Sequence, residues 1–187
     1  MNPILLEFPD AFETERLLIR APRPGDGPEL RAAIADSIEQ LRPWMPWAKE
    51  IPTPEEAELN VRQAWVKFLS REDLRLHLFS KEAGIFVGCS GLHRINWDVP
   101  KFEIGYWCCT PFTRQGLIRE AVEGITRFAF ESLKAKRLEI RCDTKNVRSR
   151  NIPEALGFML EGTLHGDAVS PSGALRNTLV FAKTSSG

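Results

Sequence analysis

The most regular pattern of apolar and polar positions lies in the stretch from Phe102 to Leu133. It begins with an apolar and aromatic run of strand length, residues 102–108, which Pro111 interrupts before a short turn that contains Gly116. Beyond the turn, apolar residues recur at spacings of three and four, which predicts an amphipathic helix. The predicted buried positions of this helix are Ile118, Ala121, Val122, Ile125, Phe128 and Ala129.

The start of that helix is a candidate anion site. The first N–H groups of a helix have no intrahelical partner and carry the positive end of its dipole. A turn that presents these groups to solvent can hold a phosphate. Every unit of strand, turn and helix contains such a turn, and most bind nothing. A single glycine therefore leaves both interpretations open.

Strands and helices alternate through the rest of the chain. Apolar runs bounded by turn residues predict strands at 15–20, 75–80, 85–92, 137–142, 158–164 and 174–182. Helical spacing predicts a short helix at Leu30–Ile34, a second helix after Thr53 and a third from Asn146 to Leu156. The second helix begins with a capping box of Thr53 and Glu56 and is predicted to bury Val61, Ala64, Trp65, Phe68 and Leu69. This order predicts an α/β (α+β) fold with one mixed, mostly antiparallel sheet of about six to seven strands, flanked by helices.

Three segments are predicted to lack regular structure. Residues 41–54 hold four prolines and two tryptophans, Trp44 and Trp47, and are predicted to form a loop. These tryptophans either pack into the core or line a substrate mouth. Pro171–Gly173 is predicted to be the turn of a hairpin, and residues 184–187 a frayed tail.

Composition narrows the class of protein. For 187 residues, 43% hydrophobic and 27% charged, one domain spanning residues 1–187 is the simplest organisation. The 25 basic residues balance 25 acidic ones, so no overall field attracts nucleic acid or an anionic membrane. No run has the length of a membrane span and the first residues do not resemble a signal peptide, so a cytoplasmic location is predicted.

The four cysteines predict no metal site. Cys89, Cys108, Cys109 and Cys142 lack the spacing of metal ligands, and two of them are adjacent. We interpret them as small apolar core residues in a reducing compartment, and no metal cofactor is predicted.

Four motifs follow one another along the chain. They are ETERLLIR at 13–20, EIGYW at 103–107, GLIREA at 116–121, and NVRS at 146–149 with LGF at 156–158. Together they resemble the motifs of GNAT-superfamily N-acetyltransferases, in the branch that acetylates N-terminal alanine or serine of ribosomal proteins. The resemblance extends over roughly residues 12–183.

The resemblance implies a GNAT fold with a splayed sheet, acetyl-CoA as co-substrate and an amine as acceptor. It implies a CoA diphosphate site lined by Arg114, Gln115, Gly116, Leu117, Ile118 and Arg119. It also implies that pantetheine lies beside Trp107, Cys108 and Cys109 and contacts Asn146. Of the three fixed places in the family's loop, here Thr113, Gly116 and Ile118, only the glycine is kept. Arg114 stands where this branch commonly has another glycine.

Two residues are candidates for the chemistry of acetyl transfer. By likeness to related acetyltransferases, Glu103 would receive the amine proton, through a water, and Ser149 would hydrogen-bond the CoA sulfur. The alternatives are a salt-bridged strand residue for Glu103 and a capping residue for Ser149. Tyr106 is interpreted as packed, and among the histidines His93 is one that could face the cleft.

Three functions stay open at this point. The first is acetyl transfer to the α-amine of a protein N-terminus. The second keeps the reaction but changes the acceptor to a small amine, such as a polyamine, an amino acid or an antibiotic. The third is a GNAT-like domain that binds acyl-CoA without turnover. The protein is expected to be a monomer or homodimer that binds neither nucleic acid nor membrane.

Overall fold

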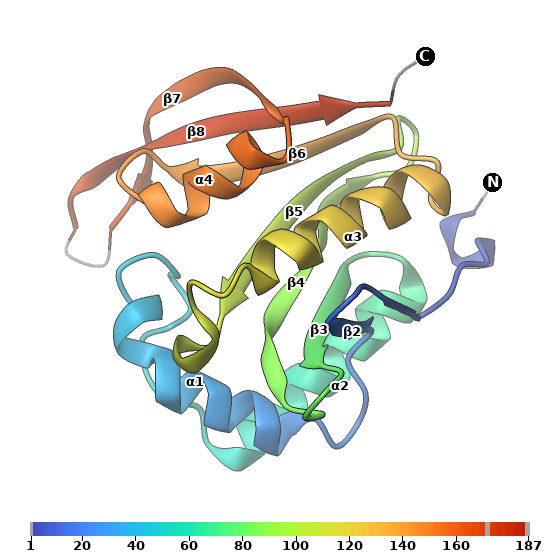
Figure 1. The fold of residues 1–187 in the computed structure, drawn as a ribbon, viewed down its shortest axis with the longest axis vertical. Coiled ribbons are helices and arrows are strands. Elements are labelled where there is room, and N and C mark those ends of the chain that lie inside the picture. The colour runs from blue at the N-terminus through green and yellow to red at the C-terminus, as the bar shows by residue number, and fades with distance from the viewer. Residues whose placement is uncertain (1, 171–172, 186–187) are drawn as a thin grey trace.

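The computed structural model describes residues 2–170 and 173–185, which form one sheet of eight strands covered by helices on both faces (Figure 1). The strands are β1 (Ala11–Glu13), β2 (Leu17–Arg20), β3 (Leu74–Ser80), β4 (Phe86–Asn96), β5 (Lys101–Cys108), β6 (Arg137–Asp143), β7 (Met159–Val169) and β8 (Leu175–Thr184). The helices are α1 (Gly27–Leu41), α2 (Pro54–Ser70), α3 (Leu117–Glu131) and α4 (Val147–Ala155), with short 3₁₀ turns η1 (Pro3–Leu5) and η2 (Thr110–Phe112).

The sheet is splayed between its fifth and sixth strands. The strand order is β1-β2-β3-β4-β5-β6-β8-β7, and β5 and β6 form its parallel pair. They pair only over residues 101–103 and 137–139, after which they separate. Figure 1 shows β5 running away from the group formed by β6, β7 and β8. The edge of β5 from Ile104 to Cys108 is therefore not covered by β6, and the predicted mixed, mostly antiparallel and splayed sheet is confirmed.

Helix α3 crosses one face of the sheet and is fixed there by the predicted stripe. Ala121, Val122 and Ile125 are fully buried against the strands, whereas Ile118 is only partly buried. A buried side chain the size of Val122 or Ile125 contributes about 1.5–3 kcal/mol, so the stripe accounts for much of the helix's attachment. This helix and α4 lie in front of the sheet in Figure 1, and α2 lies behind β3.

The N-terminus of α2 has the predicted capping box. The Thr53 side chain accepts a hydrogen bond from the Glu56 N–H at 3.2 Å, and the Glu56 carboxylate accepts one from the Thr53 N–H at 2.8 Å. The predicted stripe of this helix is correct at Val61, Ala64 and Phe68 but wrong at Leu69, which is 48% exposed. Leu69 lies one position beyond Phe68, so the helix rotation turns it toward solvent.

Several elements are longer than predicted. Strand β1 was not predicted, since its three residues are too few to show a period. The short helix predicted at 30–34 extends through 15 residues as α1, and β7 continues to Val169. Thr184, predicted in the tail, pairs with Arg137 as the last residue of β8. Two residues of the predicted 171–173 turn, and residues 186–187, lie outside the described residues.

In the described part of the chain, no helix is both long and apolar enough to cross a membrane.

Candidate functional site

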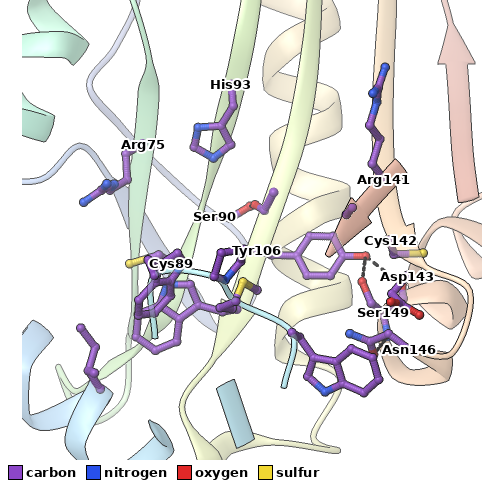
Figure 2. Close-up of a pocket in the computed structure, with 18 of the residues that line it drawn as sticks. Arg75, Cys89, Ser90, His93, Tyr106, Arg141, Cys142, Asp143, Asn146 and Ser149 are labelled. Carbon is purple, nitrogen blue, oxygen red and sulfur yellow. Dashed lines mark hydrogen bonds between the residues drawn. The ribbon is translucent and has the colours of Figure 1, made fainter. Parts of the chain in front are cut away.

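A cleft of about 1230 Å³ opens where β5 and β6 separate (Figure 2). Its floor is the middle of the sheet, and its walls are the 41–53 loop with α2 on one side and β6, α4 and the β7–β8 hairpin on the other. The lining includes Trp44, Trp47, Arg75, His93, Glu103, Tyr106, Trp107, Arg141, Asn146, Ser149 and Arg176. The cleft thus joins residues from both sides of the splayed sheet.

The floor of the cleft follows from strand register. In the antiparallel pair of β4 and β5, His93 lies opposite Glu103, and Gly91 lies opposite Gly105. Opposite residues project to the same face, so these two rows are neighbours in the cleft floor. The glycine row carries no side chains, which leaves an open strip beside the His93–Glu103 row.

Glu103 lies within a network of ion pairs. One carboxylate oxygen is 3.3 Å from Nε of Arg94 and 3.5 Å from Nε of Arg141, and Arg141 also pairs with Glu139 at 3.3 Å. The Glu103 side chain is only 19% exposed, so its charge is held chiefly by these two guanidinium groups. Arg94 has a left-handed backbone, with φ of 46°, which is uncommon outside glycine.

His93 pairs with a carboxylate at the cleft. Its Nδ1 lies 2.6 Å from a carboxylate oxygen of Asp73, and both side chains are about one-third exposed. In Figure 2 the imidazole points from β4 into the cleft above Ser90. The ring leans over Gly105, where an added Cβ would meet its Cδ2 at 3.1 Å and its Nε2 at 3.3 Å.

Tyr106 and Ser149 meet at the opening between the strands. The Tyr106 hydroxyl donates to the Ser149 carbonyl at 2.8 Å and accepts from the Ser149 hydroxyl at 3.2 Å. Figure 2 shows the tyrosine ring reaching from β5 toward α4. Burial raises the pKa of Tyr106 well above its ordinary value, so its hydroxyl keeps its proton at neutral pH.

The outer part of the cleft is aromatic. Trp47 is 48% exposed, and its ring centroid lies 5.8 Å from that of Trp107. The guanidinium of Arg176 lies over the ring of Trp44 at 5.6 Å, pairs with Asp143 and donates to the Pro43 carbonyl. Of the two interpretations of the loop tryptophans, lining of the cleft is the one that the structure supports.

The turn before α3 has the backbone of an anion site. Gly116 caps the helix with φ of 78°, and no side chain caps the first N–H groups. Arg114 also has a left-handed backbone, with φ of 64°. That conformation accounts for the glycine that related chains commonly have at this place.

The 13–20 motif holds this turn in position. The guanidinium of Arg16 donates to the Gln115 carbonyl at 3.0 Å and to the Glu120 carboxylate at 2.6 Å. Glu120 also accepts from the Thr14 hydroxyl at 2.6 Å. Burial alone would raise the pKa of Glu120, but the hydrogen bonds from Thr14 and Arg16 outweigh it and lower the pKa. Two of the sequence motifs are thus one structural unit.

The cysteines near the cleft are protonated thiols. Burial raises the pKa of Cys108 to about 11 and that of Cys109 still further. The N–H of Cys109 donates to the Val87 carbonyl at 2.8 Å and its thiol to the Phe86 carbonyl at 3.6 Å. Both donors of Cys109 are therefore already used within the protein, whereas Cys108 is only partly buried at the strand edge.

The predicted site residues fall into two groups, except Cys108 and Cys109, which are not among the residues that line the cleft. Glu103, Trp107, Asn146 and Ser149 line the cleft, and the Asn146 side chain also caps α4 by accepting from the Ser149 N–H at 3.1 Å. Arg114 to Arg119 form the separate turn, in which Leu117 and Ile118 face the core while Arg114 and Arg119 are exposed.

Sequence reasoning missed the Asp73–His93 pair, the Tyr106 hydroxyl and the guanidinium groups around Glu103. The local pattern gave no signal for the pairing of His93 with Glu103, because the predicted strand ended at residue 92 and the register shifts between His93 and Asn96. Among residues 2–170 and 173–185, no group of three or more His, Cys, Asp or Glu side chains is arranged to hold a metal ion.

Comparison with known proteins agrees with this arrangement. The family model described as acetyltransferase (GNAT) domain matches residues 16–159. YdaF of Bacillus subtilis (strain 168), whose name refers to ribosomal N-acetylation, is 30% identical over 153 residues, covering 79% of this chain and 80% of its own.

Two solved structures share the fold. The microcin C7 self-immunity acetyltransferase MccE, in complex with acetyl-CoA and AMP, has a TM-score of 0.88 at 20% identity, covering 95% of this chain and 97% of its own. RimL, a ribosomal L7/L12 α-N-protein acetyltransferase in complex with coenzyme A, has a TM-score of 0.85 at 18% identity, covering 91% and 95%. Since the family model extends over most of the chain and the site has the splayed strands and helix start that its motifs imply, this protein belongs to the GNAT family of acetyltransferases.

Proposed function

We propose that this acetyltransferase moves an acetyl group from acetyl-CoA to the α-amino group of a protein N-terminus. The observation that carries the proposal is the opening between β5 and β6, which connects a strand edge suited to pantetheine with an aromatic cleft suited to a peptide. The names of YdaF and RimL, which refer to ribosomal and α-N-protein acetylation, support the choice of acceptor.

The residues present fit acetyl-CoA. The edge of β5 from Ile104 to Cys108 is free of β6, so an extended pantetheine arm can lie along it as an added strand. The uncapped N-terminus of α3 offers backbone N–H groups to the diphosphate, with Arg114 and Arg119 exposed beside it. Acetyl-CoA supplies the acetyl group as a thioester.

The hydroxyl pair at the opening serves the leaving sulfur. The lone pair of the amine forms the new C–N bond, and the C–S bond breaks with its electrons on sulfur. The Tyr106 hydroxyl is the proton donor assigned to the thiolate, and to donate it must turn its hydrogen from the Ser149 carbonyl, 2.8 Å away, toward the sulfur. The Ser149 hydroxyl holds the phenol oxygen in place. Ser149, implied by the family resemblance, thus acts together with Tyr106.

The row of His93 and Glu103 faces the acceptor side of the cleft. Glu103, the proton acceptor implied by the resemblance, lies here beside two guanidinium groups. Trp47 and Trp107 offer flat surfaces to the first side chains of a peptide. Acidic and basic side chains both line the cleft, so it has no marked preference for an acceptor of either charge.

A small α-amine that carries a nucleotide or another flat group is the second candidate. MccE, the structural neighbour that binds AMP, motivates it, as do the aromatic walls and Arg75, whose guanidinium donates to the neutral side chain of Asn60 at 2.5 Å. Because the amide of Asn60 is neutral, it does not offset the positive charge of Arg75, which can then pair with an anionic group of a ligand.

A mass-spectrometric screen tests the proposal. Peptides that begin with Ala or Ser, and a panel of small amines that includes aminoacyl nucleotides, are incubated with the protein and acetyl-CoA. A gain of one acetyl group on the peptide α-amine supports the proposal, whereas acetylation of small amines alone replaces it by the second candidate. Calorimetry with acetyl-CoA is run in parallel, and absence of binding would contradict both.

A further inference from the structure

We propose that His93, oriented by Asp73, accepts the proton of the acceptor amine. The inference rests on the proposed function, because it assigns a step of the same acetyl transfer. Its starting point is the geometry of the row that contains both His93 and Glu103.

A base for the amine must be available and must reach the reacting nitrogen. Glu103 is the other candidate in this row, and its buried Oε2 lies in ion pairs but makes no hydrogen bond. Its Oε2 lies 3.3 Å from Nε of Arg94 and 3.5 Å from Nε of Arg141. Two guanidinium groups at these distances hold the carboxylate in ion pairs, and their positive charges repel an approaching ammonium group.

His93 has the arrangement of an oriented base. The 2.6 Å contact with Asp73 fixes the proton on Nδ1, so Nε2 carries the lone pair. Among the described residues, Nε2 has no hydrogen-bond partner. A base whose far nitrogen is held by a carboxylate is the arrangement used to accept protons in many active sites.

The ring also lies closer to the reaction than Glu103 does along β5. Nε2 is 3.3 Å from the place where a Gly105 Cβ would be, so it lies over the residue between Glu103 and Trp107 on this face. The missing side chain of Gly105 is what admits the ring. The glycine row leaves room for the imidazole ring of His93. The same row is the open strip along which the amine approaches.

The other histidine–aspartate pair shows what a structural pair looks like in this protein. His77 is fully buried, and its Nδ1 lies 2.8 Å from a carboxylate oxygen of Asp26. Burial lowers the pKa of His77, against the opposing effect of Asp26, so this imidazole stays neutral and inaccessible. His93 instead lies at the cleft surface, where it can exchange protons with a ligand and with water.

The proton balance of the step is complete. Nε2 of His93 takes one proton from the ammonium form of the acceptor, and the freed lone pair attacks the thioester carbonyl carbon. The C–N bond forms, the C–S bond breaks, and Tyr106 protonates the thiolate. The second amine proton restores the phenol through water, and His93 releases its proton to solvent. Besides Asp73, which contacts His93, the charged residues that line the cleft are Lys49, Glu50, Glu56, Arg75, Arg94, Glu103, Arg141, Asp143, Asp167 and Arg176.

The pH dependence of kcat/KM for the acceptor found in the screen tests the assignment. We expect His93→Gln to lower kcat/KM by about 100-fold near pH 6.5, because a general base contributes at least that factor. The loss should shrink toward pH 9, since an α-amine with a reference pKa near ~7.7 is then already neutral. His165→Gln, the same change at an exposed position of β7, is the control and should behave as the unaltered protein.

Asp73→Asn tests the positioning role. Without the carboxylate the imidazole loses the contact that orients it. We therefore expect kcat to fall about tenfold while the KM for the acceptor stays unchanged, and Asp73→Glu to restore most of kcat. A purely structural role would lower the melting temperature of Asp73→Asn and leave kcat unchanged.

Other outcomes separate this inference from the proposed function. An unchanged profile in His93→Gln, or the pH-dependent loss appearing in Glu103→Gln instead, overturns the role of His93 while leaving acetyl transfer in place. If the unaltered protein acetylates no amine, both fail. Gly105→Ala is the second variant if His93→Gln does not fold, since its Cβ displaces the ring without removing it. An unchanged kcat in Gly105→Ala also contradicts the assignment.

Discussion

The buried carboxylate of Asp26 joins several elements through its hydrogen bonds. Asp26 is almost fully buried and accepts hydrogen bonds from His77, from both terminal nitrogens of Arg20 and from the Arg23 N–H, each at 2.8–2.9 Å. Burial alone would raise the pKa of Asp26, but these donors lower it well below its ordinary value. From its position just before α1, the carboxylate therefore links that helix to Arg20 in β2 and to His77 in β3.

Asp26→Asn tests that link. The amide keeps the shape but leaves the Arg20 guanidinium without its charge partner, so we expect a loss of about 3–5 kcal/mol in the free energy of unfolding at pH 7. Urea denaturation followed by circular dichroism measures it. Glu39→Gln is the control, since the pair of Glu39 with Arg42 is exposed and should matter little. A loss no larger than that of the control would show that Asp26 is not a structural centre.

The carboxylate of Glu120 is expected to stabilise the turn before α3 in a pH-dependent way. Because its folded pKa is below the unfolded value, its contribution to stability is present above the unfolded pKa and is lost as pH falls through the folded pKa. We expect Glu120→Gln to cost about 1–2 kcal/mol at pH 7, a difference that diminishes as pH falls below about 4. Chemical denaturation at pH 7 and pH 3.5 measures both values. A cost that does not change with pH would contradict the charge-based explanation.

The residues that the sequence could not place are those defined by tertiary contacts. Tyr106 was assigned to packing because its strand is apolar, yet its hydroxyl reaches Ser149, 43 positions away along the chain. Nothing in the local pattern distinguishes a tyrosine that ends in the core from one that ends at an opening. Gly116 and Glu103, in contrast, were placed by motifs whose strand and turn form locally.

At the scale of elements, prediction succeeded where periodicity and caps are strong. The α3 stripe and the α2 capping box are present, because both depend on residues within a few turns of one another. Strand β1 and the full length of α1 were missed. The three residues of β1 are held by pairing with β2, and α1 packs with α2, so neither is decided by its own sequence.

The turn between β5 and α3 requires a glycine at position 116, where the backbone is left-handed. We expect Gly116→Val to abolish acetyl-CoA binding, since a branched side chain there stands between the helix N–H groups and a phosphate. Calorimetry with acetyl-CoA measures the affinity, and circular dichroism verifies the fold.

Gly157→Val is a matched control for this change. Gly157 follows α4 with φ of 70°, close to the 78° of Gly116, and a Cβ there would meet nothing within 4 Å. Both variants therefore carry similar backbone strain, on the order of 1–2 kcal/mol, but only one lies at the turn. Equal affinities for acetyl-CoA in the two variants would place the diphosphate elsewhere.

At the scale of the whole molecule, the separation of β5 from β6 organises the function. The strands pair over three residues and then diverge, so the sheet itself provides the passage that joins the two substrates. The sequence predicted a mixed sheet, and the family resemblance predicted its splay. The lining of the cleft combines segments from residue 30 to residue 178, whose meeting depends on the packing of the entire chain.

The aromatic wall gives the last prediction, which concerns the acceptor. Trp47 belongs to the 41–53 loop, is half exposed and lies against Trp107, so its ring is available to a peptide in the cleft. We expect Trp47→Ala to raise the KM for the acceptor by about tenfold, roughly 1.4 kcal/mol, as for the loss of one aromatic contact. The Kd for acetyl-CoA should not change. Steady-state kinetics and calorimetry measure the two constants, with Val66→Ala as an exposed apolar control on α2. If Trp47→Ala instead weakens the binding of acetyl-CoA and leaves the KM for the acceptor unaltered, this side of the cleft binds acetyl-CoA, and the inferred positions of the two substrates are reversed.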